Sequence, residues 1–142
     1  MTVPFNLIKI QALAVIVVNI LFSQQVVGYY PQWVQSSFPI FSIDFSVVTH
    51  VNNAFAWPDE NANIQSHSNM FNISNAQTIH SQGAKFLISL GGWGNDVGFE
   101  AIVSSPILRN DLINNLIVIC DNYGYDGVDL DWEHPNSTQN RQ

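Results

Sequence analysis

Cysteine and basic residues are scarce in this sequence. The single cysteine, Cys120, excludes an intramolecular disulfide framework and any thiolate zinc cluster. Only four lysines and arginines stand against 11 acidic residues, and they are scattered along the chain. So few positive charges cannot neutralise a run of phosphates, and nucleic acid is not expected as a partner. The formal net charge of −7 disfavours binding to an anionic membrane surface for the same reason.

Charged side chains are also few. They make up 11% of the 142 residues, less than half of the roughly 25% that is usual in soluble domains. Apolar residues make up 46%, and uncharged Asn, Ser and Gln supply much of the remaining polarity. The composition therefore allows a hydrophobic core and excludes disorder caused by excess charge. The length is sufficient for one domain at most.

The N-terminus carries a stretch, Ile10–Phe22, that is apolar apart from two residues. It is about 13 residues long, short of the roughly 20 needed to span a bilayer. A lysine precedes it and polar residues follow, which is the layout of a secretory signal peptide. We therefore expect residues 1–24 to be a signal peptide and residues 25–142 to be secreted and extracellular, with no membrane partner after signal removal. An uncleaved anchor is the alternative. Sequons at Asn72 and Asn136 are consistent with export.

Four short, strand-like apolar runs alternate with helical stretches along the rest of the chain. Proline or a glycine pair ends each run, and the runs lie at residues 25–30, 47–57, 85–90 and 126–132. Helices are expected from about residue 69 to 81 and from Pro106 to Gly124, the second with a wide apolar stripe. Strands that alternate with helices predict a parallel sheet covered by helices.

The fourth run is rich in acidic residues. If Asp126–Glu133 is a strand, Asp129, Asp131 and Glu133 share one face, and apolar side chains occupy the other. Successive carboxyl-bearing residues would then lie about 6.6 Å apart at Cα. Repulsion between partly buried carboxylates raises the pKa of at least one of them, so that a proton donor remains available near neutral pH.

Three interpretations of this acidic strand are considered. It could be a solvated edge strand whose acids provide solubility, although its other face is apolar. It could hold calcium or magnesium, although the spacing differs from the helix-loop-helix calcium loop and a strand directs its ligands in parallel. It could carry catalytic carboxylates at the carboxyl end of a parallel strand, where such enzymes place their active sites, and we favour this third interpretation.

The acidic segment resembles the DxxDxDxE signature of glycoside hydrolase family 18, the chitinases and related enzymes, with every motif position filled. Ser89–Gly92 is similar to the family's SxGG motif on the third strand, Val26–Tyr30 to its first strand, and Asn53–Ala56 to its second. The resemblance thus covers the whole expected mature chain. It implies an α/β fold of the TIM (β/α)8-barrel type, truncated here to roughly the first four βα units of a partial catalytic domain at 25–142.

The resemblance implies hydrolysis of chitin or related N-acetylglucosamine-containing glycans with retention of configuration. It also implies that no enzyme side chain acts as the nucleophile, because the 2-acetamido group of the sugar attacks the anomeric carbon in this family. Glu133 would protonate the glycosidic oxygen and later activate water. Asp131 would hydrogen-bond the acetamido N–H, and Asp129 would share a proton or hydrogen bond with Asp131.

Other positions receive supporting roles from the resemblance. Ser89, Gly91 and Gly92 would make space for the acids, with Ser89 bonded to Asp129, although a tight turn after a strand is an alternative reading of the glycines. Asp126 lies on the opposite face of the strand and is interpreted as structural. Three aromatic residues would line sugar subsites, or else belong to the core: Tyr29, Phe55 and Trp93. No metal and no cofactor are expected.

The resemblance includes only half of the family barrel. The absent half would supply a sixth-strand Tyr and Asp and an eighth-strand Trp, so we expect this chain alone to be inactive or weak. Open sheet edges would favour self-association or a partner that supplies the second half. The alternative function is a noncatalytic, lectin-like protein that binds chitin or N-acetylglucosamine oligomers.

Overall fold

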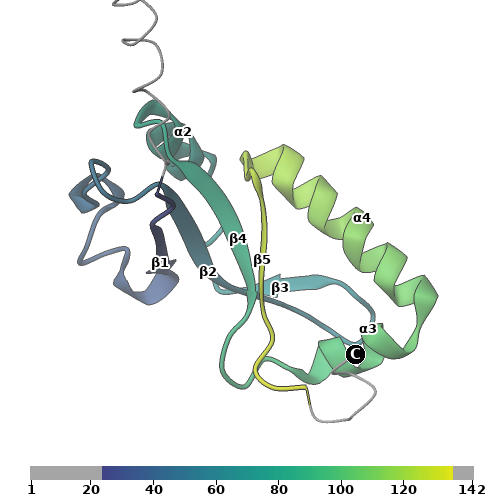
Figure 1. Cartoon of the computed structure of the whole chain (residues 1–142). Coiled ribbons are helices and arrows are strands. Elements are labelled where there is room, and N and C mark those ends of the chain that lie inside the picture. Colours follow the sequence, from purple (N-terminus) through teal and green to yellow (C-terminus); the bar gives the residue numbers. More distant parts are fainter. Residues whose placement is uncertain (1–23, 136–142) are drawn as a thin grey trace, which may run out of the picture.

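Four parallel strands form the centre of the computed structural model, which describes residues 24–135. They lie side by side in the order β1 (Val27–Pro31), β2 (His50–Pro58), β4 (Lys85–Gly91) and β5 (Gly127–Asp131), as Figure 1 shows. All three neighbouring pairs are parallel. The predicted parallel arrangement of the strands is thereby confirmed, and β1 and β5 are the two edges of the described sheet.

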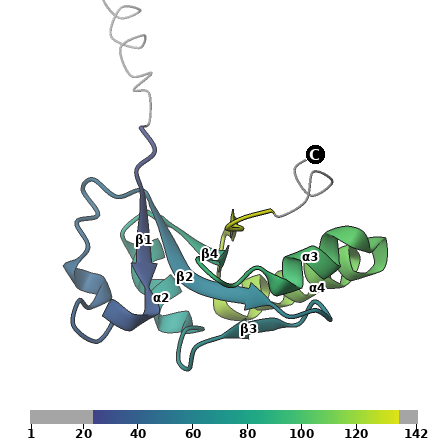
Figure 2. The same ribbon diagram turned by 90° about the horizontal axis from the view of Figure 1, so that it is seen from below.

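Two elements were not expected from the sequence. A three-residue strand, β3 (Ile64–Ser66), pairs antiparallel with the end of β2. A short helix, α3 (Val97–Ser104), precedes the longer helix α4 (Pro106–Tyr123), and the two lie next to each other in Figure 2. Two 3-10 turns, η2 (Gln32–Val34) and η3 (Ile40–Ser42), occupy the connection between β1 and β2.

The expected helix ends follow from local capping. In α4, the Ser105 side chain accepts a hydrogen bond from the N–H of Leu108, and Gly124 ends the helix in the left-handed conformation with φ 74°. The other predicted helix, α2 (Ile73–Ser81), begins four residues later than expected. Asn69 has φ 65°, which no α-helix accommodates, and Asn72 caps the helix by accepting from the N–H of Ser74.

The core lies between the sheet and the helices. Phe86, Ile88 and Leu90 on β4 have the same parity and are all fully buried. Gly98 allows α3 to pack directly on the end of β2, since a Cβ there would lie 2.0 Å from the carbonyl oxygen of Pro58. The other face of β4 and β5 carries Ser89 and Asp129, which are register partners. The sheet therefore turns its acidic residues away from the hydrophobic core.

A buried polar network joins three parts of the fold. The Asn53 side chain is fully buried, and its Nδ2 donates to the Tyr125 hydroxyl at 2.6 Å and to the Met70 carbonyl at 3.0 Å. Gln35 Nε2 in turn donates to Asn53 Oδ1 at 2.9 Å. Burial raises the pKa of Tyr125 to about 12, so its hydroxyl stays protonated. The network fixes the β1–β2 connection and the segment just before β5 against β2.

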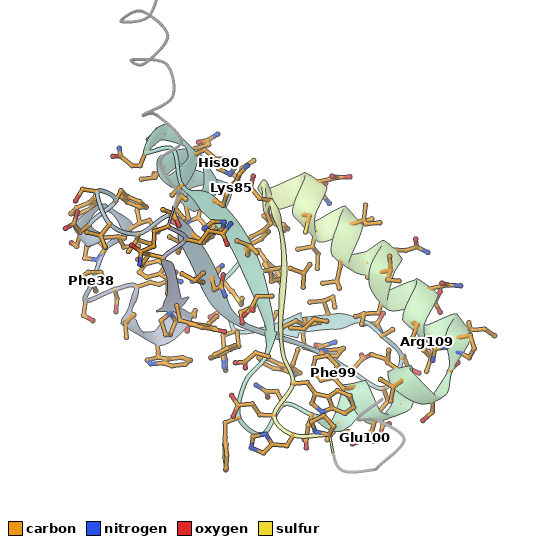
Figure 3. All side chains as sticks on the ribbon, viewed as in Figure 1. Phe38, His80, Lys85, Phe99, Glu100 and Arg109 are labelled. Carbon is orange, nitrogen blue, oxygen red and sulfur yellow. The ribbon has the colours of Figure 1, made fainter. Side chains whose placement is uncertain are left out.

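Asp126 lies at the amino-terminal end of β5, away from the other motif acids. Its carboxylate accepts from Lys85 Nζ at 2.7 Å, from the N–H of Phe86 at 2.8 Å and from His80 Nε2 at 2.7 Å. Figure 3 shows His80 and Lys85 at this end of the sheet. Burial alone would raise the pKa of Asp126, but these partners outweigh it and lower the pKa to about 2. Asp126 thus joins α2, β4 and β5.

Replacement of this carboxylate is expected to destabilise the fold in a pH-dependent way. Asp126→Asn should lower the free energy of unfolding by about 1–2 kcal/mol at neutral pH. Because the folded-state pKa of about 2 lies below the ordinary value of 3.8, this contribution is present above pH 3.8 and is lost as the pH falls towards 2. Urea unfolding at neutral pH and at about pH 2.5 measures the difference, with Asp111→Asn on exposed α4 as the control. An equal loss at both pH values would contradict a charge-based role.

The described part of the chain has no helix with the length and apolar character required to traverse a membrane. Apart from Gln24, the predicted signal peptide lies outside the described residues, as does the sequon at Asn136. Asn72 is exposed at the start of α2.

Candidate active site

The three motif acids gather at the carboxyl end of β5. Asp129 and Asp131 are the register partners of Ser89 and Gly91 on β4, and Glu133 follows two residues after β5. Paired residues of parallel strands project to the same face, so Asp129 and Asp131 project over β4 on the side away from the core. The carboxyl ends of parallel strands are where α/β proteins of this kind bind substrates.

Asp129 is held by two hydroxyl groups from other strands. Ser89 Oγ on β4 donates to Asp129 Oδ2 at 2.7 Å, which is the contact expected from the motif. Tyr29 Oη on β1 donates to the same oxygen at 3.0 Å, across two intervening strands. Burial raises the pKa of Tyr29, and the hydrogen bond to Asp129 and the negative charge of that carboxylate raise it further. Tyr29 therefore remains protonated and able to donate to Asp129.

Asp131 is positioned through its backbone by the glycine pair. Gly92 N donates to the Asp131 carbonyl at 2.8 Å. Gly91 has φ 126°, and a Cβ at this position would lie 2.1 Å from the same carbonyl oxygen. Only glycine allows β4 to approach β5 this closely. The glycines therefore do more than end a strand, because they set the position from which the Asp131 side chain projects.

The Asp131 carboxyl is predisposed to hold a proton. Burial raises its pKa, and the nearby charges of Glu133 and Asp129 raise it further. Asp131 therefore keeps its proton to a higher pH than an isolated aspartic acid does. This is the proton donor or acceptor behaviour expected of clustered carboxyls.

Glu133 borders an open hollow of about 280 Å³. The same hollow is lined by Trp93, which is 82% exposed, and by His134, whose ring packs edge-on against Trp93 at 5.9 Å. Trp132, between the acids in sequence, instead stacks on Phe99 of α3 at 5.3 Å. Glu133 and Trp93 thus line one accessible space, with a proton-transfer group and an apolar ring surface beside each other.

A second group of aromatic side chains lies at the carboxyl end of β1. Tyr29 and Phe55 have ring centroids 5.9 Å apart, and Trp33 lies 6.2 Å from Phe55. The Phe55 ring packs over Gly92, where a Cβ would lie 2.9 Å from it. Of the three predicted aromatic residues, Tyr29 and Phe55 are therefore together, and Trp93 lies in the hollow beside Glu133.

Two residues of this face were missed by sequence reasoning. Trp33 is 61% exposed and extends the aromatic group, and its position just after the strand-ending Pro31 was the available signal. Asn52 is the register partner of Tyr29 and is 3% exposed, with no hydrogen-bond partner for its Oδ1 in the described part of the chain. A polar residue inside an apolar strand gave no indication of what it would face.

Metal binding has little geometric basis here. Among residues 24–135, no three or more His, Cys, Asp or Glu side chains are arranged to hold a metal ion. Asp129 and Asp131 instead lie on one strand with Glu133 just after it, and Asp129 already accepts hydrogen bonds from two hydroxyls. The arrangement suits proton transfer and hydrogen bonding to a polar substrate.

Parallel strands with intervening helices, and acids at the strands' carboxyl ends, define an α/β protein of the (β/α)8-barrel type, of which this chain contains part. The sequence model of glycosyl hydrolases family 18 matches residues 25–142. The chain belongs to this family, as its motifs indicated, and the predicted fold class is confirmed by solved structures of family members.

Similar proteins include enzymes and a lectin. A class V chitinase of Arabidopsis thaliana is 33% identical over 114 residues, which is 72% of this chain and 28% of that protein. A mutant of catalytic domain 2 of Ostrinia furnacalis Group II chitinase, solved in complex with (NAG)5, is 29% identical with a TM-score of 0.70 over 81% of this chain and 33% of its own. A chitinase-like agglutinin from Robinia pseudoacacia is 30% identical with a TM-score of 0.70 over 80% of this chain and 36% of its own. The chain therefore spans less than a third of the length of curated relatives such as the Arabidopsis chitinase.

Proposed function

We propose that this chain carries the acidic half of a chitinase active site. The substrate would be chitin or a related glycan that contains N-acetylglucosamine, and the reaction would be retaining hydrolysis assisted by the substrate's acetamido group. The observation that supports this most directly is the grouping of Asp129 and Asp131, which hydrogen bonds from β1 and from the end of β4 hold on β5, with Glu133 two residues beyond the strand.

Glu133 is the proposed acid and base. In the first step its carboxyl proton moves to the glycosidic oxygen while the acetamido oxygen of the sugar bonds to the anomeric carbon and the leaving sugar departs. In the second step the Glu133 carboxylate takes a proton from water, whose oxygen bonds to the anomeric carbon and releases the acetamido group. Its place beside an exposed Trp93 supports this role, since an aromatic ring suits the apolar face of a sugar.

Asp131 and Asp129 are the proposed supports of the acetamido group. An Asp131 carboxylate would accept the acetamido N–H and offset the positive charge that develops as the oxygen attacks. The raised pKa of Asp131 means that its proton must be shared or displaced for this to occur. Asp129 accepts hydrogen bonds from two hydroxyls and lies next to Asp131 on the same strand face. It would therefore take part in the proton sharing at Asp131.

The 142-residue chain alone is expected to turn substrate over slowly. The described sheet ends at β5, so Glu133 projects from a sheet with an open edge, and Leu130 on its outer face is 68% exposed. Groups from further strands of a barrel would be needed to enclose and distort the reacting sugar. Export through the signal peptide at 1–24 remains part of this proposal.

The function is tested by completing the barrel. The chain would be joined to the remaining four βα units of a family 18 chitinase, and release of reducing sugar from chitin oligomers would be followed. We expect turnover by the chimera and little by the chain alone. Binding without product release by a folded chimera would contradict the enzymatic proposal.

The second candidate is a noncatalytic, lectin-like function, which the similarity to the Robinia agglutinin favours. The retained Glu133 argues for the enzyme, because binding alone does not require an acid at that position. Chitin beads that retain the chimera without releasing product, equally well with Glu133→Gln, would support the lectin.

A further inference from the structure

The sequon at Asn72 lies on the surface of the fold. Asn72, Ile73 and Ser74 form an Asn-x-Ser acceptor sequence, and the middle residue is not proline. All three residues are exposed, Ile73 to 49%. They begin α2, whose buried residues Ala76 and Ile79 pack in the hydrophobic core. The acceptor sequence is therefore accessible while the helix that follows it is held in place.

The oxygen and the nitrogen of the Asn72 side-chain amide differ in what they contact. Oδ1 accepts a hydrogen bond from the N–H of Ser74 at 2.9 Å and thereby caps α2. Nδ2 has no hydrogen-bond partner among the residues that the structure describes. Because a helix cap requires only the acceptor oxygen, the nitrogen contributes nothing to it. Nδ2 is therefore available for a covalent bond that leaves the cap in place.

A sugar on Nδ2 is compatible with the backbone around Asn72. This residue is extended, with φ −137° and ψ 108°, and its carbonyl accepts from the N–H of Asn75 at 3.1 Å. Neither feature involves the side-chain nitrogen. An amide that carries a sugar on nitrogen keeps its carbonyl oxygen as an acceptor, so Oδ1 can still bond Ser74. The first turn of α2 is therefore the same with and without a sugar.

α2 and the motif acids lie on opposite faces of the sheet. Ala76 and Ile79 of α2 pack in the core with the buried side chains of β4, whereas Ser89 and Asp129 project from the other face. Figure 1 shows α2 at the end of the sheet where β4 begins, and the segment that leads from β4 to α3 at the other end. A bulky, hydrated group at the start of α2 therefore leaves the hollow at Glu133 open.

We propose that Asn72 is a site of N-linked glycosylation, where one amide caps α2 through its oxygen and carries a glycan on its nitrogen. The donor would be a lipid-linked oligosaccharide diphosphate whose first sugar is N-acetylglucosamine. Nδ2 loses one proton and bonds to the anomeric carbon of that sugar, while the bond from the same carbon to the diphosphate oxygen breaks and the lipid diphosphate leaves. The inference rests on export, which is part of the proposed function, because this transfer takes place in the secretory pathway.

The test follows the mass of the full chain produced in a eukaryotic secretory cell line. We expect a glycan that peptide-N-glycosidase removes, with conversion of the Asn72 amide to a carboxylate. Trypsin cleaves after lysine and arginine, so Asn72 falls in the peptide that ends at Lys85 and Asn136 in the peptide that ends at Arg141. Mass spectrometry of these peptides therefore reports on each sequon separately. Because a carboxylate also caps a helix, the melting temperature should survive removal of the glycan.

Two variants at the sequon separate the glycan from the cap. Ser74→Ala destroys the acceptor sequence but keeps the backbone N–H that Asn72 Oδ1 accepts from, so it should lose the glycan and retain α2. Asn72→Ala removes both the acceptor nitrogen and the capping oxygen, so it should also lose the glycan and melt at a lower temperature than Ser74→Ala. Equal melting temperatures of the two variants would contradict the double role of this amide.

A change of leader separates this inference from the proposed export. The full chain would be compared with one in which a standard secretion leader replaces residues 1–24, and both secreted and cell-retained chain would be digested. An unmodified Asn72 in chain that has entered the pathway by either leader would overturn the inference and leave the function intact. A glycan at Asn72 with the standard leader alone would support the inference and overturn export through residues 1–24.

Discussion

Glu133→Gln in the completed barrel is expected to lower turnover of chitin oligomers by about 10²- to 10⁴-fold, which is the range that general acid catalysis contributes. The substitution keeps the size and hydrogen-bonding reach of the side chain but removes the transferable proton. Because Glu133 borders an open hollow beside Trp93, the amide should leave the shape of that hollow unchanged. Oligomer affinity is therefore expected to stay within a few-fold of the parent.

The measurement is kcat and Kd on the same oligomer, at several pH values. Asp111→Asn, an acid-to-amide change on exposed α4, serves as the control and should leave both constants unchanged. Turnover by Glu133→Gln at the parent rate would show that another group supplies the proton.

Gly91→Ala is expected to cause the largest loss of stability among single methyl additions to the site. Its Cβ would lie 2.1 Å from the Asp131 carbonyl oxygen, which belongs to a backbone that cannot move aside without separating β4 from β5. The φ of 126° adds a backbone penalty that glycine alone avoids. Together these effects should lower the free energy of unfolding by about 3 kcal/mol or more.

A matched substitution separates the two effects. Gly83, after α2, has φ 77°, and a Cβ there would have no other atom within 4 Å, so Gly83→Ala carries the backbone penalty alone. That variant should lose only about 1 kcal/mol. Urea unfolding of both variants measures the difference. Equal losses would mean that the close approach of Gly91 to Asp131 contributes nothing.

The sheet and its acids could be predicted because their signals are local. Alternating faces placed Asp129 and Asp131 on one side of β5, and Pro106 and Gly124 bounded α4 correctly. The Ser89 contact to Asp129 followed from a family motif. Each of these depends on residue spacing or on a capping residue that acts within its own segment.

The remaining features depend on contacts between distant segments. The Tyr29 bond to Asp129 joins residues 100 apart, and Asp126 takes its partners from 40 and 46 residues away. The short β3 strand forms only because β2 offers it an edge, and no periodicity reveals three residues of this kind. The aromatic contact between Trp33 and Phe55 arises from how a loop meets the end of β2 after the sheet has formed.

The most direct test of the account is the anomeric form of the first product released from a chitin oligomer by the completed barrel. Proton NMR during the first minutes of reaction distinguishes the two anomers before they equilibrate. Attack by the acetamido group, with Glu133 as acid and then base, predicts the β-anomer, because two inversions restore the original configuration. A first product in the α form would contradict substrate assistance, because it would require a single inversion by direct attack of water on the anomeric carbon.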